Sequence, residues 1–208
     1  SILENGSDSL LLCTERGIVV FNKKTRLLTW LRYKPGLGLP SEKFTGRNVF
    51  QSIDDMNGLK WFSTPNRLIQ YNPHNQILKE YQFDLNDKGS NTPTLTGPIL
   101  AERSGDIWTA SREGIIILNI HTGVFRHLMK GIEIRSLYQD SGGSVWAGSV
   151  GHGLFRFNKS IDRFDPFFDP QSTIGKETIV NIIEDDLKNL WIITNSSIVK
   201  LNADRERS

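Results

Sequence analysis

Four carboxylates stand six positions before four tryptophans, and this repeated pairing is the arrangement in the chain most able to do chemistry. The pairs are Asp55 with Trp61, Glu102 with Trp108, Asp140 with Trp146, and Asp185 with Trp191. Glycine is the third residue after the first three carboxylates, which is typical of a tight turn, and Lys188 takes that place in the fourth. Such a turn could hold calcium, but each offers only one or two carboxylates, against the roughly six to eight oxygen ligands that calcium takes. We therefore predict that each carboxylate caps its turn and that no metal is bound.

The same turns resemble the Asp-box of sialidases, which raises the question of catalysis. In those enzymes the Asp-box is structural, so the resemblance implies no catalytic residue. A sialidase also needs an arginine cluster, a Tyr–Glu pair and an acid on the axis of its ring, and the arginines and carboxylates here are scattered along the chain. Glycoside cleavage is therefore the least favoured function.

Other catalytic and metal-binding motifs do not occur in the sequence. The four histidines, His74, His121, His127 and His152, have neither HxH nor HExxH spacing, so a zinc site is not expected. No glycine-rich nucleotide motif, GxSxG motif or histidine-kinase motif is present. The sequence thus predicts no catalytic residue, no cofactor and no enzymatic activity in this segment.

Composition and charge limit the partners. The chain has 208 residues and a net charge of +2, from 25 basic and 23 acidic residues that alternate along it. This mixture argues against a phosphate-binding stripe, and so against a nucleic-acid partner. No apolar run approaches the ~20 residues that a membrane span needs, so we expect no membrane contact by this segment. The single cysteine, Cys13, excludes an internal disulfide.

The tryptophans also reveal the elements that position these residues. They are 47, 38 and 45 residues apart, and Leu11 takes the same place 50 residues before Trp61. Each copy continues into an apolar stretch that ends in asparagine, at Asn22, Asn72, Asn119, Asn158 and Asn202. Each copy contains short β-prone runs divided by turn residues, and a repeat of this length with four antiparallel strands is a β-propeller blade. The blade-like repeats are roughly 1–47, 48–94, 95–131, 132–177 and 178–208.

We therefore predict an all-β fold, a partial β-propeller of about five four-stranded antiparallel blades in one segment spanning 1–208. The first blade is expected to lack its opening strand and the last to end after its third strand, at Leu201–Asn202. Both end blades are thus predicted to be incomplete, and the chain is predicted to be a fragment. An open arc exposes apolar sheet faces, so we expect the remaining blades of the same polypeptide, or a second copy, to cover them.

The repeats resemble a known family over nearly the whole chain, most clearly over residues 132–202. The run from Asp140 to Ser149, with Gly143, Trp146 and Gly148, followed by Gly153–Asn158, resembles the two-component regulator propeller repeat. The resemblance implies a periplasmic ligand-sensing segment of a Bacteroides-type hybrid histidine kinase, with an oligosaccharide as its ligand and the kinase elsewhere in the chain. A protein-interaction propeller without a small ligand is the alternative, and a propeller glycosidase is less favoured.

Position suggests where a ligand binds. If the first strand of each blade is innermost, the second-to-third turns share one face with the fourth-to-first connections, which include 34–47 and 84–97. On that loop face we predict five ligand-binding residues, Arg67, Arg112, Glu113, His152 and Asn195. The tryptophans, by contrast, are expected to pack between blades, and Phe167 and Phe168 to fill a blade junction.

Overall fold

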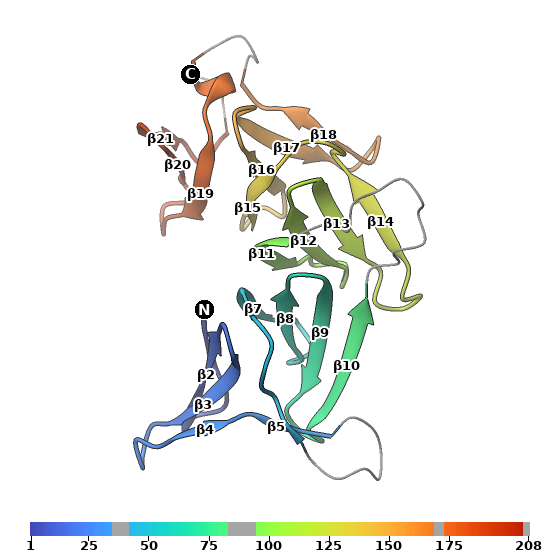
Figure 1. Cartoon of the computed structure of the whole chain (residues 1–208). Coiled ribbons are helices and arrows are strands. Elements are labelled where there is room, and N and C mark those ends of the chain that lie inside the picture. Colours follow the sequence, from blue (N-terminus) through green and yellow to red (C-terminus); the bar gives the residue numbers. More distant parts are fainter. Residues whose placement is uncertain (35–41, 83–94, 169–172, 206–208) are drawn as a thin grey trace. The chain divides into compact units, whose positions relative to one another are not determined.

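The computed structural model describes residues 1–34, 42–82, 95–168 and 173–205 (Figure 1). These residues form short strands almost throughout, with one 3-10 turn, η1, at Ile174–Lys176. The chain divides into two compact units, Ser1–Ala101 and Glu102–Ser208. The prediction that 1–208 is one propeller segment, with the repeat boundaries given above, stays a prediction.

The first unit contains two four-stranded antiparallel sheets. The first has the order β1-β2-β3-β4 and the second the order β7-β8-β9-β10. Two short strands, β5 and β6, pair antiparallel after the first sheet, and β11 ends the unit beside β7 and β8. The strands are β1 Ile2–Glu4, β2 Ser9–Thr14, β3 Gly17–Asn22, β4 Leu28–Trp30, β5 Arg32–Tyr33, β6 Glu42–Lys43, β7 Gln51–Asp54, β8 Lys60–Thr64, β9 Arg67–Asn72, β10 Ile77–Gln82 and β11 Leu95–Ala101.

The second unit continues the same up-and-down pattern. Here β12, β13 and β14 pair antiparallel in that order, β15 to β18 form a four-stranded sheet, and β19 to β21 form a three-stranded sheet. The strands are β12 Ile107–Ser111, β13 Gly114–Leu118, β14 Phe125–Leu128, β15 Ile134–Gln139, β16 Val145–Ser149, β17 Leu154–Asn158, β18 Arg163–Pro166, β19 Ile179–Glu184, β20 Leu190–Thr194 and β21 Ile198–Leu201.

The register confirms the repeat read from the sequence. In every copy the Trp position lies on the second strand, and the residue opposite it lies on the third. The opposed pairs are Leu11 and Val20, Trp61 and Gln70, Trp108 and Ile117, Trp146 and Arg156, and Trp191 and Lys200. The all-β propeller blade predicted from the spacing is therefore the observed unit of structure.

The first blade differs from the prediction. Its opening strand is present as β1, in which Ile2, Leu3 and Glu4 pair with Leu12, Leu11 and Leu10. The prediction of an incomplete first blade is thus wrong, because three residues are too few to show alternation in the sequence yet enough to pair through the backbone. The last sheet has three strands among the described residues, as predicted.

The carboxylates cap their turns, as predicted, and they also bind the tryptophans. In Asp55, Asp140 and Asp185 one oxygen accepts the backbone N–H four residues later, at 2.8 to 3.0 Å, and the other accepts the indole N–H of the paired tryptophan at 2.9 Å. Hydrogen bonds from Asn189 and Trp191 lower the pKa of Asp185 to about 2. The turn position three residues later has positive φ in all four copies, and Lys188, at +66°, adopts it without being glycine.

Three of the four repeated tryptophans are buried and Trp191 is half-buried, as expected of residues that pack within and between sheets. Trp61 and Trp146 are fully buried and Trp108 is 3% exposed. Around Trp146 a core cluster joins residues of the fourth and fifth blades, including Phe167, Ile179 and Leu190. The Phe167 ring lies 5.0 Å from the Trp146 ring in an edge-on contact, and half-buried Phe168 packs against it. The prediction that these two phenylalanines fill a blade junction is confirmed.

Trp108 is the exception in this set. Its indole N–H is buried and finds no acceptor among the described residues. The paired carboxylate is Glu102 rather than aspartate, and its oxygens accept hydrogen bonds from Ser104, Gln139 and Lys159 instead. The two buried tryptophans of the second unit, Trp108 and Trp146, thus share their packing role but differ in one hydrogen bond.

This difference gives a stability prediction. Trp146→Phe leaves the buried Asp140 carboxylate short of one donor, whereas Trp108→Phe removes an N–H that is already unpaired. Both lose ring volume, so we expect Trp146→Phe to lower the free energy of unfolding by about 1–3 kcal/mol more than Trp108→Phe does. Urea unfolding of the two variants measures this, and equal losses would show that the carboxylate–indole bond adds no stability.

Candidate ligand-binding site

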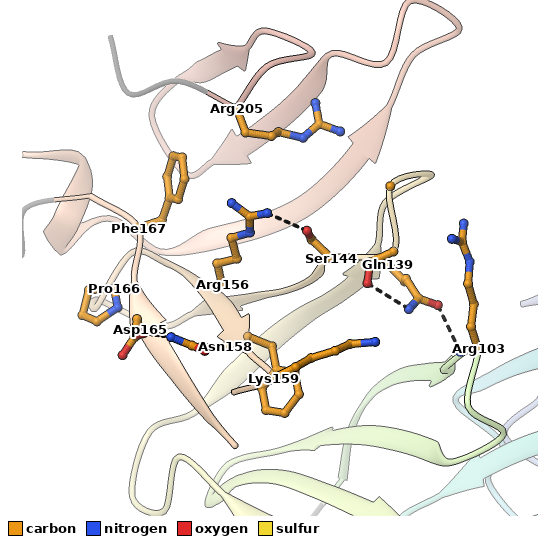
Figure 2. Close-up of a pocket in the computed structure, with 13 residues that line it drawn as sticks. Arg103, Gln139, Ser144, Arg156, Asn158, Lys159, Asp165, Pro166, Phe167 and Arg205 are labelled. Carbon is orange, nitrogen blue, oxygen red and sulfur yellow. Dashed lines mark hydrogen bonds between the residues drawn. The ribbon is translucent and has the colours of Figure 1, made fainter. Parts of the chain in front are cut away.

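A cavity of about 830 Å³ lies in the second unit, at the end of the fourth blade where β15 turns into β16 and β17 turns into β18 (Figure 2). The turn residues Gly142–Ser144 form one wall and Arg156–Lys159 another, while Arg103 and Arg205 reach in from neighbouring segments. The full lining is Arg103, Gln139, Gly142, Gly143, Ser144, Arg156, Phe157, Asn158, Lys159, Asp165, Pro166, Phe167 and Arg205.

Strand pairing fixes Arg156 in this cavity. Arg156 lies on β17, opposite Trp146 on one side and opposite Asp165 on the other. Its guanidinium carbon is 5.4 Å from the centroid of the Trp146 ring, and its Nη2 donates to the Ser144 hydroxyl at 2.8 Å. The Ser144 backbone N–H in turn donates to Asp140. The capped turn and the buried ring therefore hold this guanidinium in place from two directions.

Glu102 supports a second wall. Its side chain is only 4% exposed, and one carboxylate oxygen accepts from the Gln139 amide at 2.9 Å and from Lys159 Nζ at 3.2 Å. The other oxygen accepts from the Ser104 backbone N–H at 2.8 Å and from its hydroxyl. Burial raises the pKa of Glu102, but hydrogen bonds from Ser104, Gln139 and Lys159 outweigh it and lower the pKa to about 2. The carboxylate is thus ionised at neutral pH and balances the Lys159 charge.

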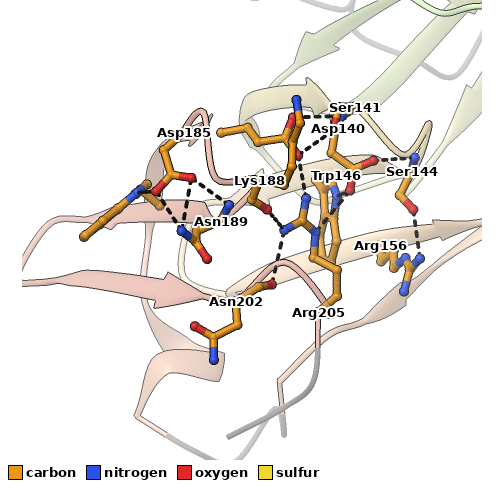
Figure 3. A network of polar contacts seen from close by, with 12 residues as sticks. Asp140, Ser141, Ser144, Trp146, Arg156, Asp185, Lys188, Asn189, Asn202 and Arg205 are labelled. Atoms are coloured by element: carbon orange, nitrogen blue, oxygen red, sulfur yellow. Dashed lines mark hydrogen bonds and ion pairs between the residues drawn. The ribbon is translucent and has the colours of Figure 1, made fainter.

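A buried ion network closes the side toward the last blade (Figure 3). Arg205 pairs with Asp140 at 3.3 Å and with Glu184 at 2.7 Å, and it also donates to the carbonyls of Lys188 and Asn202. All three ionised side chains of this network are less than a tenth exposed. Glu184 further accepts from the Ser141 N–H at 2.9 Å and from its hydroxyl at 3.0 Å. The network therefore ties the turn of the fourth blade to the end of β19.

The remaining charges of the cavity are not all balanced. Asp165 is bound by Asn158 and by Arg163, and these hydrogen bonds lower the pKa of its carboxyl. Arg103 donates to the backbone carbonyls of Asp140 and Ser141. Among the described residues, neither Arg103 nor Arg156 has a carboxylate within ion-pair distance. The cavity thus presents arginine donors and small polar groups rather than acid–base pairs.

The residues predicted to bind ligand lie elsewhere. Arg112, Glu113, His152 and Asn195 are exposed in turns between second and third strands, and His152 hydrogen-bonds through Nδ1 with the Val150 carbonyl. Arg67, in the first unit, pairs with Glu80 and lines a cavity of about 210 Å³ with Arg47 and Asn66. None of the five lines the 830 Å³ cavity, which opens at the other end of β16 from His152. That they bind a ligand stays a prediction.

Sequence reasoning passed over Arg103, Arg156 and Lys159. One signal was available, because Arg156 stands opposite the repeated Trp position, where earlier copies have Val20, Gln70 and Ile117. Among the residues that the structure describes, no group of three or more histidine, cysteine or acidic side chains is placed to hold a metal ion. In the same part of the chain no helix is long and apolar enough to cross a membrane.

The depressed pKa of Glu102 gives a second prediction. Because the folded pKa of about 2 lies below the unfolded value of about 4.3, the ionised carboxylate stabilises the fold above about pH 4.3, and this is lost as pH falls toward 2. Glu102→Gln should therefore lower the free energy of unfolding by about 1–3 kcal/mol at pH 7, with the deficit shrinking toward pH 2. Urea unfolding from pH 7 to pH 2 measures this, with exposed Glu113→Gln as the control. A deficit independent of pH would contradict the assignment.

Comparison with known proteins is based on the fold. No protein-family model matches the chain, and no curated protein matches it. The structure matches the extracellular domain assigned to the hybrid two-component system BT4673 of B. thetaiotaomicron with a TM-score of 0.72 and 20% identity. It matches the corresponding domain of BT3049 from the same organism with a TM-score of 0.74 and 17% identity. Virginiamycin B lyase from Staphylococcus aureus matches with a TM-score of 0.65 and 17% identity.

The coverage shows how much of each protein is compared. The matches include 96% and 99% of this chain but only 26% and 27% of the BT4673 and BT3049 domains, so the chain spans about a quarter of their length. For the lyase they include 97% of this chain and 68% of the enzyme. The chain therefore has the β-propeller fold found in the extracellular domains of Bacteroides two-component sensors, in agreement with the resemblance of its repeats.

Proposed function

We propose that this chain is an extracytoplasmic ligand-sensing segment of a hybrid two-component sensor. It binds an oligosaccharide and signals to a kinase elsewhere in the polypeptide, from a periplasmic location. The observation that supports this most directly is the fold match to two sensor extracellular domains over almost the whole chain, together with the motif from Asp140 to Asn158.

The 830 Å³ cavity is the binding site in this proposal. Its volume lies in the range of small-ligand sites, about 300–1,000 Å³. Gln139, Ser144 and Asn158 line it with amide and hydroxyl groups, which can exchange hydrogen bonds with sugar hydroxyls. The carboxylates near it are engaged in hydrogen bonds and ion pairs, so binding rather than bond cleavage is the function that we assign to it.

Signalling requires two states with different affinity for the ligand. The network of Arg205, Asp140 and Glu184 is suited to such a role, because it links the cavity wall to the last blade. A ligand that contacts Arg156 and Ser144 is connected to Asp140 through a single residue, because the Ser144 backbone N–H donates to that carboxylate. In this proposal ligand binding changes the stability of the ion pairs that connect the fourth blade to the last blade.

A protein-interaction propeller without a small ligand is the second candidate. It is favoured by apolar side chains that are exposed on the last sheet, Val180, Ile183 and Ile198, at 42%, 46% and 65%. A propeller enzyme is a third, because virginiamycin B lyase has a similar fold. Turnover of a bound sugar would favour the enzyme, and uniform absence of sugar binding would favour protein interaction.

A glycan array followed by titration tests the proposal. We expect saturable binding of one oligosaccharide class to the 208-residue chain. Ser144→Trp places a large side chain at the cavity wall and should weaken that binding at least about tenfold, equivalent to roughly 1.4 kcal/mol. The double variant Arg112→Ala, His152→Ala, on the predicted loop face, should bind normally. Weaker binding by the double variant together with normal binding by Ser144→Trp would place the site on the loop face. If no oligosaccharide on the array binds, oligosaccharide sensing is refuted.

A further inference from the structure

The position opposite the repeated Trp holds a cation in the fourth and fifth blades. Five equivalent positions on third strands hold Val20, Gln70, Ile117, Arg156 and Lys200. Arg156 and Lys200 are both exposed cations over a tryptophan ring, at 5.4 Å and 5.7 Å from the ring centroid. Arg156 lines the 830 Å³ cavity, whereas Lys200 does not. The cavity therefore has a cation that packing alone does not require there.

The Arg156 guanidinium is fixed but largely unused as a donor. A guanidinium has five N–H groups, and among the described residues the bond to Ser144 is the one that Arg156 makes. Its direction is set by the Trp146 face below it and by the capped turn beside it. Figure 2 shows the guanidinium in the cavity, near Ser144 and facing the side where Arg205 lies. A guanidinium that is held in place in this way loses little conformational freedom when it binds an anion.

The other charges leave this one unbalanced. Lys159 is paired with Glu102, and Arg205 is paired with Asp140 and Glu184. Asp165, the acidic residue in the cavity lining, is paired with Arg163. Arg103 approaches from the other side of the Asp140 turn and adds a second cation that has no carboxylate partner among the described residues. The cavity is thus a positive site within a chain whose overall charge is only +2.

We propose that this cavity selects an acidic sugar, one that carries a carboxylate or a sulfate group, and that Arg156 forms a bidentate pair with that group. Arginine matches two oxygens of a carboxylate or sulfate with two parallel N–H donors, a geometry that a neutral hydroxyl does not offer. Arg103 contributes attraction at longer range. The choice of a sugar rests on the proposed function, whereas the choice of an anion rests on the charges of the cavity.

Calorimetric titration of the 208-residue chain tests this at low salt. The probes are a uronic acid oligomer, a sulfated disaccharide, a neutral oligomer of the same length, and inorganic sulfate. We expect at least one acidic sugar to bind ten times or more tightly than the neutral oligomer. We also expect its affinity to fall as sodium chloride rises from about 0.02 to 0.5 M, because salt screens charge.

Two substitutions at equivalent positions make the test specific. Arg156→Gln should reduce the preference for the acidic sugar to threefold or less, and Arg156→Lys should retain part of it, because charge remains while the fork is lost. Lys200→Gln, which removes the matching cation from the next blade, should leave the preference unchanged. Thermal unfolding of all three variants checks that they fold, and because Arg156 is exposed we expect little change.

The outcomes separate this inference from the proposed function. Equal binding of acidic and neutral sugars, unaffected by Arg156→Gln, would overturn the acidic site and leave oligosaccharide sensing intact. Binding of inorganic sulfate that depends on Arg156, without binding of any sugar, would support the anion site and count against sugar sensing. No binding of any acidic probe, including sulfate, would overturn the inference.

Discussion

The pair of hydrogen bonds accepted by one aspartate, from a turn N–H and from a tryptophan indole, is the interaction on which three of the five blades depend. It fixes two things at once, because the carboxylate shapes the turn between the first two strands and also holds the ring that fills the core. In Asp55, Asp140 and Asp185 both bonds are present with nearly the same lengths. Asp140 is buried, and a buried carboxylate is unfavourable unless it is well hydrogen-bonded, so in the fourth blade the turn and the ring stabilise each other.

The same turns connect one blade to the next within the second unit. The residue before the turn carboxylate is Gln139 in one copy and Glu184 in the next. Gln139 bonds to Glu102, and Glu184 bonds to Ser141, so each reaches the turn of the preceding copy. Arg205 adds an ion pair to the second of these ties. Polar contacts between turns and apolar contacts around Trp146 thus hold neighbouring sheets together from different sides.

Periodic features were predictable from the sequence, and the individual contacts were not. Repeated Trp, Gly and Asn positions report the backbone geometry of the blades, so the strands and the turns followed from spacing, and the role of Phe167 followed from an apolar side chain near a strand end. The strand β1 was missed because a three-residue strand has no detectable period. The cavity was missed because its residues come from separated segments, such as Arg103, Arg156 and Arg205, and charge pairing between them depends on the folded structure. Loops were favoured as binding positions on general grounds, whereas the cavity lies at the turns that seemed only structural.

The copy that has glutamate in place of aspartate contributes to the charge balance of the cavity. Glu102 has one more methylene than aspartate, and its oxygens bind Gln139 and Lys159 rather than the indole of Trp108. The unpaired buried N–H costs about 1–3 kcal/mol, so the exchange is unfavourable for stability by itself. What it provides is a buried carboxylate that neutralises Lys159 and orients Gln139, both of which line the cavity. Lys159 and Arg205 each form ion pairs with carboxylates. Arg156 forms none among the described residues, so its guanidinium can donate hydrogen bonds into the cavity. Departures from the local rules of a fold are expected at functional or strained sites, and this departure from the aspartate pattern occurs at the wall of the cavity that we assign to the ligand.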